Sequence, residues 1–289
     1  MLAQFPVPVM QKTIAHKKGF TLIELSIVLV IIGLIVGGVL VGRDLINAAA
    51  IRSQISQIEK FNTAVNTFYG KVRAWPGDMD TASAASFGLP AHLGAPGACG
   101  IFSNDGLIQG YTTWTGEGDC GQISGQGSYE TGQFWTDLAS PAGGQLIEGN
   151  FSGVNGSCAS DINVSNVATC MPAAKIGSNN YINVLTGIGG NFYLLGALPA
   201  TDTGDNELLG YPSLTVAQAY AIDKKMDDGF PTTGNVGYNL GYTTTHPMAP
   251  SATSCYDNGS VGGAQLQYST TYNSASLNCN SSFKIKGGD

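Results

Sequence analysis

The chain has 289 residues, of which only 11% are charged and 40 are glycine. Residues 1–19 contain three lysines and no acid, which leaves 10 of the 13 basic residues against all 20 acids and a net charge of −10 for residues 20–289. This argues against a nucleic-acid-binding protein, because no basic stripe is available to neutralise phosphates. The composition is instead typical of a β-rich, loop-rich secreted domain.

The first predicted element is an apolar helix. Residues 20–42 read FTLIELSIVLVIIGLIVGGVLVG, a run of 23 residues with one charge, and about 20 residues suffice to span a bilayer. Lys17 and Lys18 precede it, so residues after the helix are expected outside the cytoplasm. The run is too long for the apolar part of a secretory signal, about 7–15 residues. A plain membrane anchor remains an alternative.

Glu24 is the one charge in this run. An ionised acid at the centre of a lipid-embedded helix costs about 2.5–3.5 kcal/mol, and less near the interface. A simple anchor gains nothing from this charge. Cleavage after Gly19 would create a cationic α-amine on Phe20, one helical turn before Glu24. Pairing of this amine with Glu24 of another subunit would favour one register of packed helices, because other registers leave a buried charge unpaired.

The segment KKGFTLIELSIVLVIIG resembles the cleavage and methylation motif of type IV prepilins and type II secretion pseudopilins. The resemblance implies that a membrane peptidase cuts between Gly19 and Phe20, that the new Phe20 amine is N-methylated, and that Glu24 is required for assembly. It also implies that the catalytic residues belong to the peptidase. The implied partners are other pilin subunits, in a homopolymer or a mixed filament, the prepilin peptidase/methylase, and the inner-membrane assembly machinery.

The sequence departs from this family at one position. Many members have a proline about 22 residues into the mature chain, where this chain has Val41. Gly33, Gly37, Gly38 and Gly42 surround that position. Glycines weaken a helix by about 1 kcal/mol each relative to alanine, and their two GxxxG spacings also permit close helix approach. The sequence leaves both uses open.

An amphipathic helix continues from the apolar run. Its apolar residues recur at steps of three and four, which predicts one helix from Phe20 to about Arg73, and Trp75-Pro76-Gly77-Asp78 should end it. The stripe is Ile46, Ala50, Ile51, Ile55, Ile58, Phe61, Val65 and Phe68. The expected division is a cleaved leader (1–19), a transmembrane half-helix (20–42), an amphipathic half-helix (43–73) and a globular periplasmic or extracellular domain (74–289).

Within this domain, the pattern predicts a long loop over residues 79–125 and a short helix with an apolar patch over residues 130–153. β-branched and aromatic residues between glycines predict a two-stranded hairpin over residues 180–197. Residues 214–228 are expected to form a short helix, and residues 232–289 to be loop-rich.

Three segments extend the resemblance beyond the amino terminus. WPGDM, FWTDL with LIEGNFSG, and AYAIDKKMDDGFPTTGNV look like segments shared by large bacterial prepilin-type proteins. In the last of them, Thr215 is the expected cap of the 214–228 helix, while Gly229 and Pro231 should stop it. These segments support one continuous pilin-like domain over an unrelated domain joined to a pilin helix.

Six cysteines follow the apolar run, and none forms a CxxC pair. An even number outside a membrane helix indicates disulfides in an oxidising compartment. Of 15 pairings, we favour those between sequence neighbours, with free buried thiols as the alternative. The favoured pairs are Cys99–Cys120, Cys158–Cys170 and Cys255–Cys279.

Asp223, Asp227 and Asp228 are candidate calcium ligands, because carboxylates are the oxygen ligands that calcium prefers. The alternative is a salt-bridged helix end with Lys224 and Lys225. A second acidic loop, with Asp202, Asp205 and Glu207, lacks calcium-loop spacing. No catalytic constellation is recognisable: GxSxG, HExxH and P-loop motifs are absent, and His92 and His246 are expected in surface or loop positions.

The sequence therefore predicts an α+β, pilin-like fold, with a long amino-terminal helix packed on an antiparallel sheet domain with disulfide-closed loops. The function that the resemblance implies is that of a structural subunit, held in the bacterial inner membrane and then in an extracellular or periplasmic filament. A type II secretion pseudopilin and a minor tip pilin with an adhesive role are alternatives within the class. A membrane-anchored periplasmic binding protein or enzyme is the alternative from another class.

Overall fold

The computed structural model describes residues 19–92, 104–108, 129–153, 165–187, 190–197, 212–237, 255–257, 267–269 and 276–287. The chain divides into two compact units, Met1–Ile46 and Asn47–Asp289, which we call the amino-terminal unit and the carboxy-terminal unit. Each is treated by itself below.

The first element is the helix α1, Leu22–Val72, so the single long helix predicted from the apolar pattern is confirmed. Within the carboxy-terminal unit, most of the stripe at steps of three and four is buried, with Ile58, Val65 and Phe68 fully enclosed, while Ala50 and Ile55 are partly buried. Helical geometry ends where Arg73 adopts a left-handed backbone (φ 62°). The sequence Trp75-Pro76 then prevents the helix from continuing.

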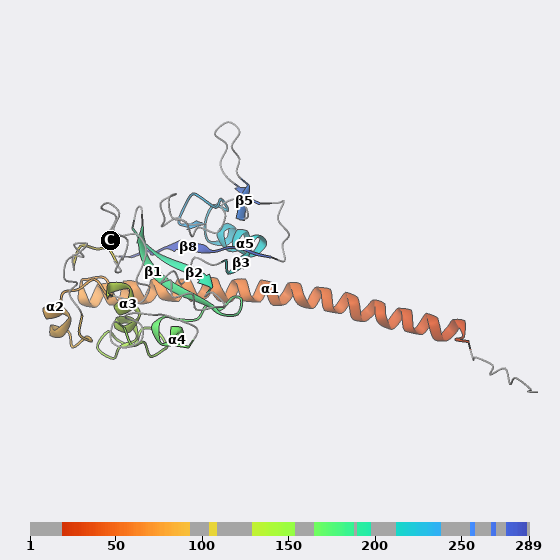
Figure 1. The fold of residues 1–289 in the computed structure, drawn as a ribbon, viewed down its shortest axis with the longest axis horizontal. Helices are drawn as coiled ribbons and strands as arrows, with labels where there is room; N and C mark the ends of the chain where they lie inside the picture. Colours follow the sequence, from red (N-terminus) through yellow and green to blue (C-terminus); the bar gives the residue numbers. More distant parts are fainter. Residues whose placement is uncertain are drawn as a thin grey trace, which may run out of the picture. The chain divides into compact units, whose positions relative to one another are not determined.

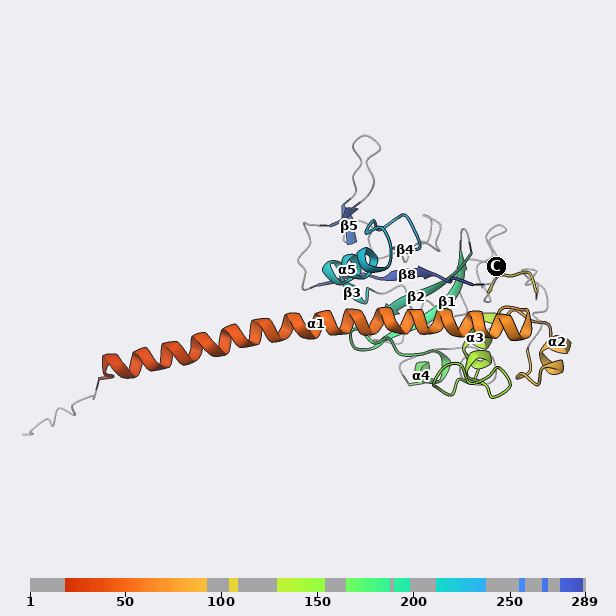
Figure 2. The ribbon, with the colours of Figure 1, turned by 180° about the vertical axis from the view of Figure 1, so that it is seen from behind.

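The main sheet is antiparallel and has the strand order β1-β2-β8-β4; Figure 1 labels β1, β2 and β8, and Figure 2 also labels β4. The predicted hairpin forms its first two strands, paired from Asn180↔Ala197 to Gly187↔Gly190. The third strand comes from the end of the chain and pairs Phe283 with Tyr193 on one side and Val236 on the other. These strands are β1 (Asn180–Gly187), β2 (Gly190–Ala197), β8 (Ser281–Lys284) and β4 (Val236–Gly237).

An aromatic cluster joins α1, the sheet and α3 (Tyr129–Ala139). The ring of Phe61 lies 4.9 Å from that of Trp135 on α3 and 5.8 Å from that of Tyr193 on β2. Trp135 and Tyr193 are fully buried. Burying such rings stabilises a fold strongly, because each removes a large apolar area from water. The helix-on-sheet core confirms the predicted α+β fold class.

The predicted helix of residues 214–228 is α5, Val216–Met226. Thr215 caps it as expected, within a capping box in which Gln218 reciprocates. The strand β3 (Leu214–Thr215) precedes α5 and pairs with β7 (Leu277–Cys279). The remaining short elements are α2 (Thr81–Ser86), α4 (Val167–Cys170), β5 (Tyr256–Asp257) and β6 (Gln267–Tyr268).

Two regions differ from the loops expected from the sequence. In residues 79–125, Asp80 accepts hydrogen bonds from the N–H groups of Ala82 and Ser83 and so caps α2. Residues 232–289 supply strands to all three sheets. β8 was missed because its segment, SSFK, buries Ser281 and Ser282 beside Phe283 and so lacks an apolar–polar alternation.

Candidate functional site

The expected processing site lies at the start of α1. Phe20 is 88% exposed, and Gly19 is exposed beside it. Residues 1–18 of the expected leader lie outside the described residues. Cleavage after Gly19 and N-methylation of Phe20 stay predictions.

Glu24 closes a capping box at this end of α1. Its Oε2 accepts the backbone N–H of Thr21 at 2.8 Å and the Thr21 hydroxyl at 2.9 Å. The Glu24 N–H in turn donates to Thr21 Oγ1 at 3.3 Å. This reciprocal pattern satisfies backbone donors that a helix start otherwise leaves open. Glu24 thus has a role within its own chain that sequence reasoning did not identify, although the spacing T-x-x-E carries the signal.

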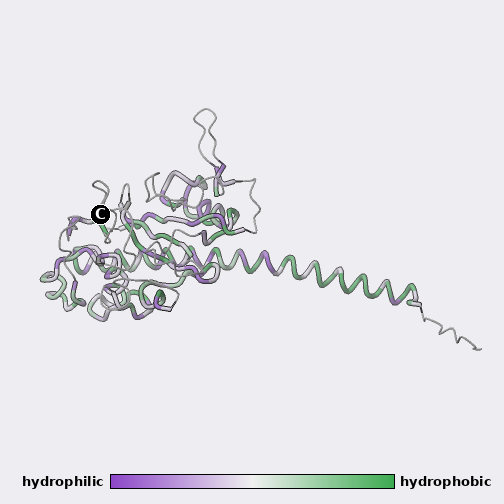
Figure 3. Tube along the Cα trace, in the orientation of Figure 1, coloured by the Kyte–Doolittle hydropathy of each residue, from purple (hydrophilic) through white to green (hydrophobic). Residues whose placement is uncertain are grey.

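The apolar side chains of the amino-terminal unit are exposed. Large hydrophobic residues from Phe20 to Ile46 are between 47% and 89% exposed, and the tube of Figure 3 is hydrophobic over most of this part of α1. α1 is also long and apolar enough to cross a membrane. A surface of this kind needs lipid or other protein to cover it, because exposed apolar area is unfavourable in water.

The four glycines within the α1 segment of this unit have free space around them. A Cβ added at Gly33, Gly37, Gly38 or Gly42 would meet no other atom within 4 Å, apart from its chain neighbours and nearby helix backbone. The helix runs through all four without interruption. Packing within the chain therefore does not explain these glycines, and close approach of another helix remains a use for them.

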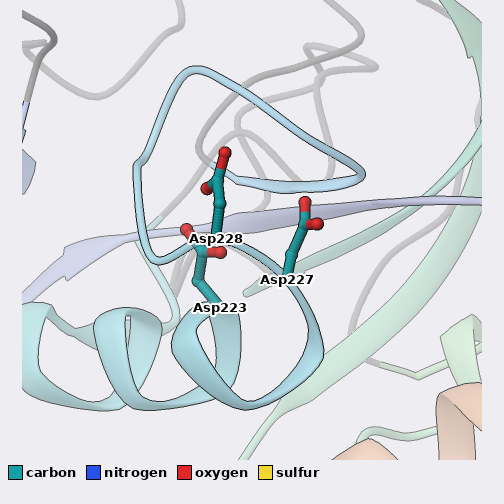
Figure 4. A group of neighbouring side chains, drawn as sticks. All are labelled: Asp223, Asp227 and Asp228. Carbon is teal, nitrogen blue, oxygen red and sulfur yellow. The ribbon is translucent and has the colours of Figure 1, made fainter.

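The three candidate calcium ligands lie together at the end of α5 (Figure 4). Asp223 is on its last turns, Asp227 is its C-cap, and Asp228 follows. One carboxylate oxygen of each can be chosen so that all three lie within 4.8 Å of one another. Burial raises the pKa of Asp223 to about 6; hydrogen bonds from Tyr268 and Gly229 oppose this shift, while the charges of Asp228 and Asp227 add to it.

Each of these carboxylates already accepts hydrogen bonds from the protein. Asp223 accepts the Tyr268 hydroxyl at 2.9 Å and the Gly229 N–H at 3.0 Å. Asp228 accepts the Phe230 N–H and the Thr233 hydroxyl.

Asp227 Oδ2 accepts the N–H groups of Asn235 and Val236. Lys224 donates to the hydroxyl of Tyr220 at 3.0 Å. Among the described residues no ion pair joins Lys224 or Lys225 to these acids, so the alternative of a salt-bridged helix end is not how they are held. The arrangement shapes the turn through residue 236, and a cation would have to share these oxygens with the existing donors.

The disulfide Cys255–Cys279 is present, with an S–S distance of 1.98 Å, which confirms one favoured pair. Cys170 is also disulfide-bonded. Cys99, Cys120 and Cys158 lie outside the described residues, as do His246 and the acidic loop of Asp202, Asp205 and Glu207.

His92 was expected at a surface or loop position. The surface position is wrong, because the residue is buried. The side chain is 1% exposed and lies 3.0 Å, from Nε2 to Oδ1, from the fully buried Asp137. Asp137 belongs to α3 and is 45 residues away in sequence, and no local pattern predicts that pairing. The segments WPGDM and FWTDL contact each other here, through the hydrogen bond from Gly77 to Asp137. Their resemblance to prepilin-type segments was the signal in the sequence that pointed to this region.

Comparison with protein families gives a match at the amino terminus. Residues 14–40 match the family model of the prokaryotic N-terminal methylation motif. No curated protein and no solved structure matches the chain. The motif is the type IV prepilin and pseudopilin signature, and the resemblance read from the sequence is therefore confirmed. It supports a type IV pilin-like or pseudopilin precursor, which is a structural rather than an enzymatic class.

Proposed function

We propose that this chain is the precursor of a type IV pilus-like filament subunit. A peptidase removes residues 1–19, the Phe20 amine is methylated, and residues 20–42 hold the subunit in the inner membrane until the helix enters a filament. The observation that carries the proposal is an apolar helix surface, 47–89% exposed at its large side chains from Phe20 to Ile46, most of which lies within the methylation motif of residues 14–40.

The proposal places residues 43–289 outside the cytoplasm, since Lys17 and Lys18 precede the apolar run and basic residues stay inside. Its partners are other pilin subunits, the prepilin peptidase/methylase and the inner-membrane assembly machinery. Gly33, Gly37, Gly38 and Gly42 would let neighbouring helices approach closely, because nothing in the described chain lies against them.

Glu24 would act twice in this scheme. Within the chain its carboxylate caps α1 through Thr21. In the filament it would meet the free Phe20 amine of a neighbouring subunit, which neutralises both charges in an apolar surrounding. The capping role needs an acceptor oxygen, whereas the pairing role needs a negative charge.

Two substitutions separate these roles. Glu24→Gln keeps a side chain that serves in a capping box but removes the charge, and we expect normal leader removal with loss of filaments. Thr21→Ala removes the capping hydroxyl and keeps the charge, and we expect filaments to persist. Glu59→Gln neutralises an exposed acid elsewhere on α1 and serves as the matched control. Filament yield and the mature amino terminus are measured for each; normal filaments from Glu24→Gln would contradict the pairing.

The finer role follows from where the subunit is found. A major pilin would dominate purified filaments by mass spectrometry, a tip pilin with an adhesive role would be scarce in them, and a pseudopilin would be needed for type II secretion.

Calcium binding at Asp223, Asp227 and Asp228 is a separate proposal, supported by their mutual distances within 4.8 Å. Calcium at saturating concentration should raise the thermal unfolding midpoint of the wild-type chain but not that of Asp228→Asn, since a ligand that binds only the folded state stabilises it. Equal midpoints with calcium and with a chelator in the wild type would contradict it, and the acids would then serve only to shape the turn.

A further inference from the structure

The chain that leaves α1 turns tightly onto α3. Gly77 has a left-handed backbone (φ 83°), and a Cβ there would lie 2.3 Å from the carbonyl oxygen of Glu130. Its N–H donates to Asp137 Oδ2 at 2.7 Å. This contact fixes the turn to α3 with one oxygen of a fully buried carboxylate.

The other oxygen of that carboxylate faces His92. The Nε2 atom of His92 lies 3.0 Å from Asp137 Oδ1, and Nδ1 lies 3.1 Å from the carbonyl oxygen of Met79. Both partners are acceptors. A neutral imidazole has one N–H and one lone pair, so it would direct that lone pair at an acceptor; an imidazolium has two N–H groups and satisfies both.

We infer that His92 is a buried imidazolium at neutral pH, that it clamps the turn of residues 77–79 to α3 through Asp137, and that alkali opens this clamp by removing one proton. A Cys–His or Ser–His catalytic pair requires a ring nitrogen with a free lone pair. The clamp offers none, because both ring nitrogens are used as donors, so its role is structural and pH-sensitive.

The charges around the ring agree with this assignment. Burial lowers the pKa of His92, but the hydrogen bond and charge of Asp137, the Met79 carbonyl and the charge of Asp80 together raise it above its usual value. Asp137 comes from α3, and Asp80 lies at the start of α2. Asp80 stays ionised across the range in which histidine titrates, because the Ser83 hydroxyl and N–H lower its pKa to about 2.

The sign of the pH effect follows. A group whose pKa is higher in the folded state stabilises the fold fully below its unfolded pKa, about 6.5 for histidine. That stabilisation is lost as the pH rises through the folded pKa. The clamp therefore weakens as the pH rises through the raised folded-state pKa of His92.

The direct test is ¹⁵N NMR of the histidine ring in the full chain, in detergent micelles. His16→Gln with His246→Gln leaves His92 as the single one of three histidines. At neutral pH we expect both ring nitrogens in the protonated form, with deprotonation only in alkali. A deprotonated ring nitrogen at neutral pH would overturn the inference, independently of the result for the variant described next.

Asp137→Asn provides the matched change. Its amide oxygen can still accept the Gly77 N–H, and its NH₂ can donate to Nε2 of a neutral His92. We expect the His92 titration to move to lower pH in this variant, and the loss of thermal stability between neutral and alkaline pH to shrink. Glu59→Gln, an exposed acid on α1, should keep the wild-type pH profile. If Asp137→Asn lost as much thermal stability between neutral and alkaline pH as the wild type does, the clamp would be ruled out.

Discussion

The two units of this chain use hydrophobic side chains in opposite ways. In the carboxy-terminal unit, Trp135 and Tyr193 are fully buried by residues of the same chain, whereas in the amino-terminal unit Leu34 is 72% exposed. The carboxy-terminal unit therefore completes its core alone, and the amino-terminal unit leaves its apolar surface for a membrane or another subunit. The comparison distinguishes the interactions that fold the subunit from those that are available to assemble it. Figure 2 shows the strands and short helices of the carboxy-terminal unit gathered along its part of α1.

The largest expected effect comes from shortening one large side chain in each unit to alanine. Trp135→Ala should lower the stability of the carboxy-terminal unit by about 3–5 kcal/mol, since it removes a buried aromatic ring and leaves a cavity. Leu34→Ala should leave the thermal unfolding of that unit unchanged and reduce filament yield. Unfolding in detergent is measured for both; destabilisation of the carboxy-terminal unit by Leu34→Ala would break the comparison.

Two glycine substitutions test how tightly the carboxy-terminal unit holds the turn after α1. Gly77→Ala should destabilise by about 1–3 kcal/mol, because φ is 83° and the new Cβ would meet backbone at 2.3 Å. Gly70→Ala is the matched control within α1: a Cβ there meets no other atom within 4 Å, and it should stabilise by about 0.5–1 kcal/mol. Denaturant unfolding distinguishes them, and similar effects at both positions would show that the turn is not held tightly on α3.

The smallest expected effect concerns the two capping boxes. Thr215→Ala should cost about 1 kcal/mol, since it removes the side-chain acceptor for the Gln218 N–H. Thr21→Ala should not change the unfolding of the carboxy-terminal unit, because Thr21 lies in the other unit. A loss at Thr21 as large as that at Thr215 would mean that the units do not unfold separately.

Local patterns predicted the elements whose partners are near in sequence. The periodic stripe from Ile46 to Phe68 predicted α1, the β-branched and aromatic residues between glycines in 180–197 predicted the β1–β2 hairpin, and Thr215 predicted the start of α5. In each, the spacing of a few residues decides the structure. The exposed apolar surface of the amino-terminal unit was likewise visible in the sequence, as the long apolar run of residues 20–42.

The rest depends on partners far apart in sequence. β8 enters the sheet beside β2 although Ser281 and Ser282 lack strand-like alternation, and His92 is buried because Asp137 pairs with it. The acidic turn illustrates a partial success: the three acids are near one another as expected, but Asp227 ends α5 and accepts N–H groups from residues 235 and 236. Sequence spacing alone does not specify such contacts.

Mass spectrometry of the mature amino terminus tests the central claim most directly. The proposed function predicts a chain that begins at Phe20 and carries an N-methyl group on its α-amine, in both membranes and purified filaments. A chain that retains residues 1–19 in filaments would contradict it, because the Phe20 amine would then be a peptide nitrogen without the charge that Glu24 is proposed to meet.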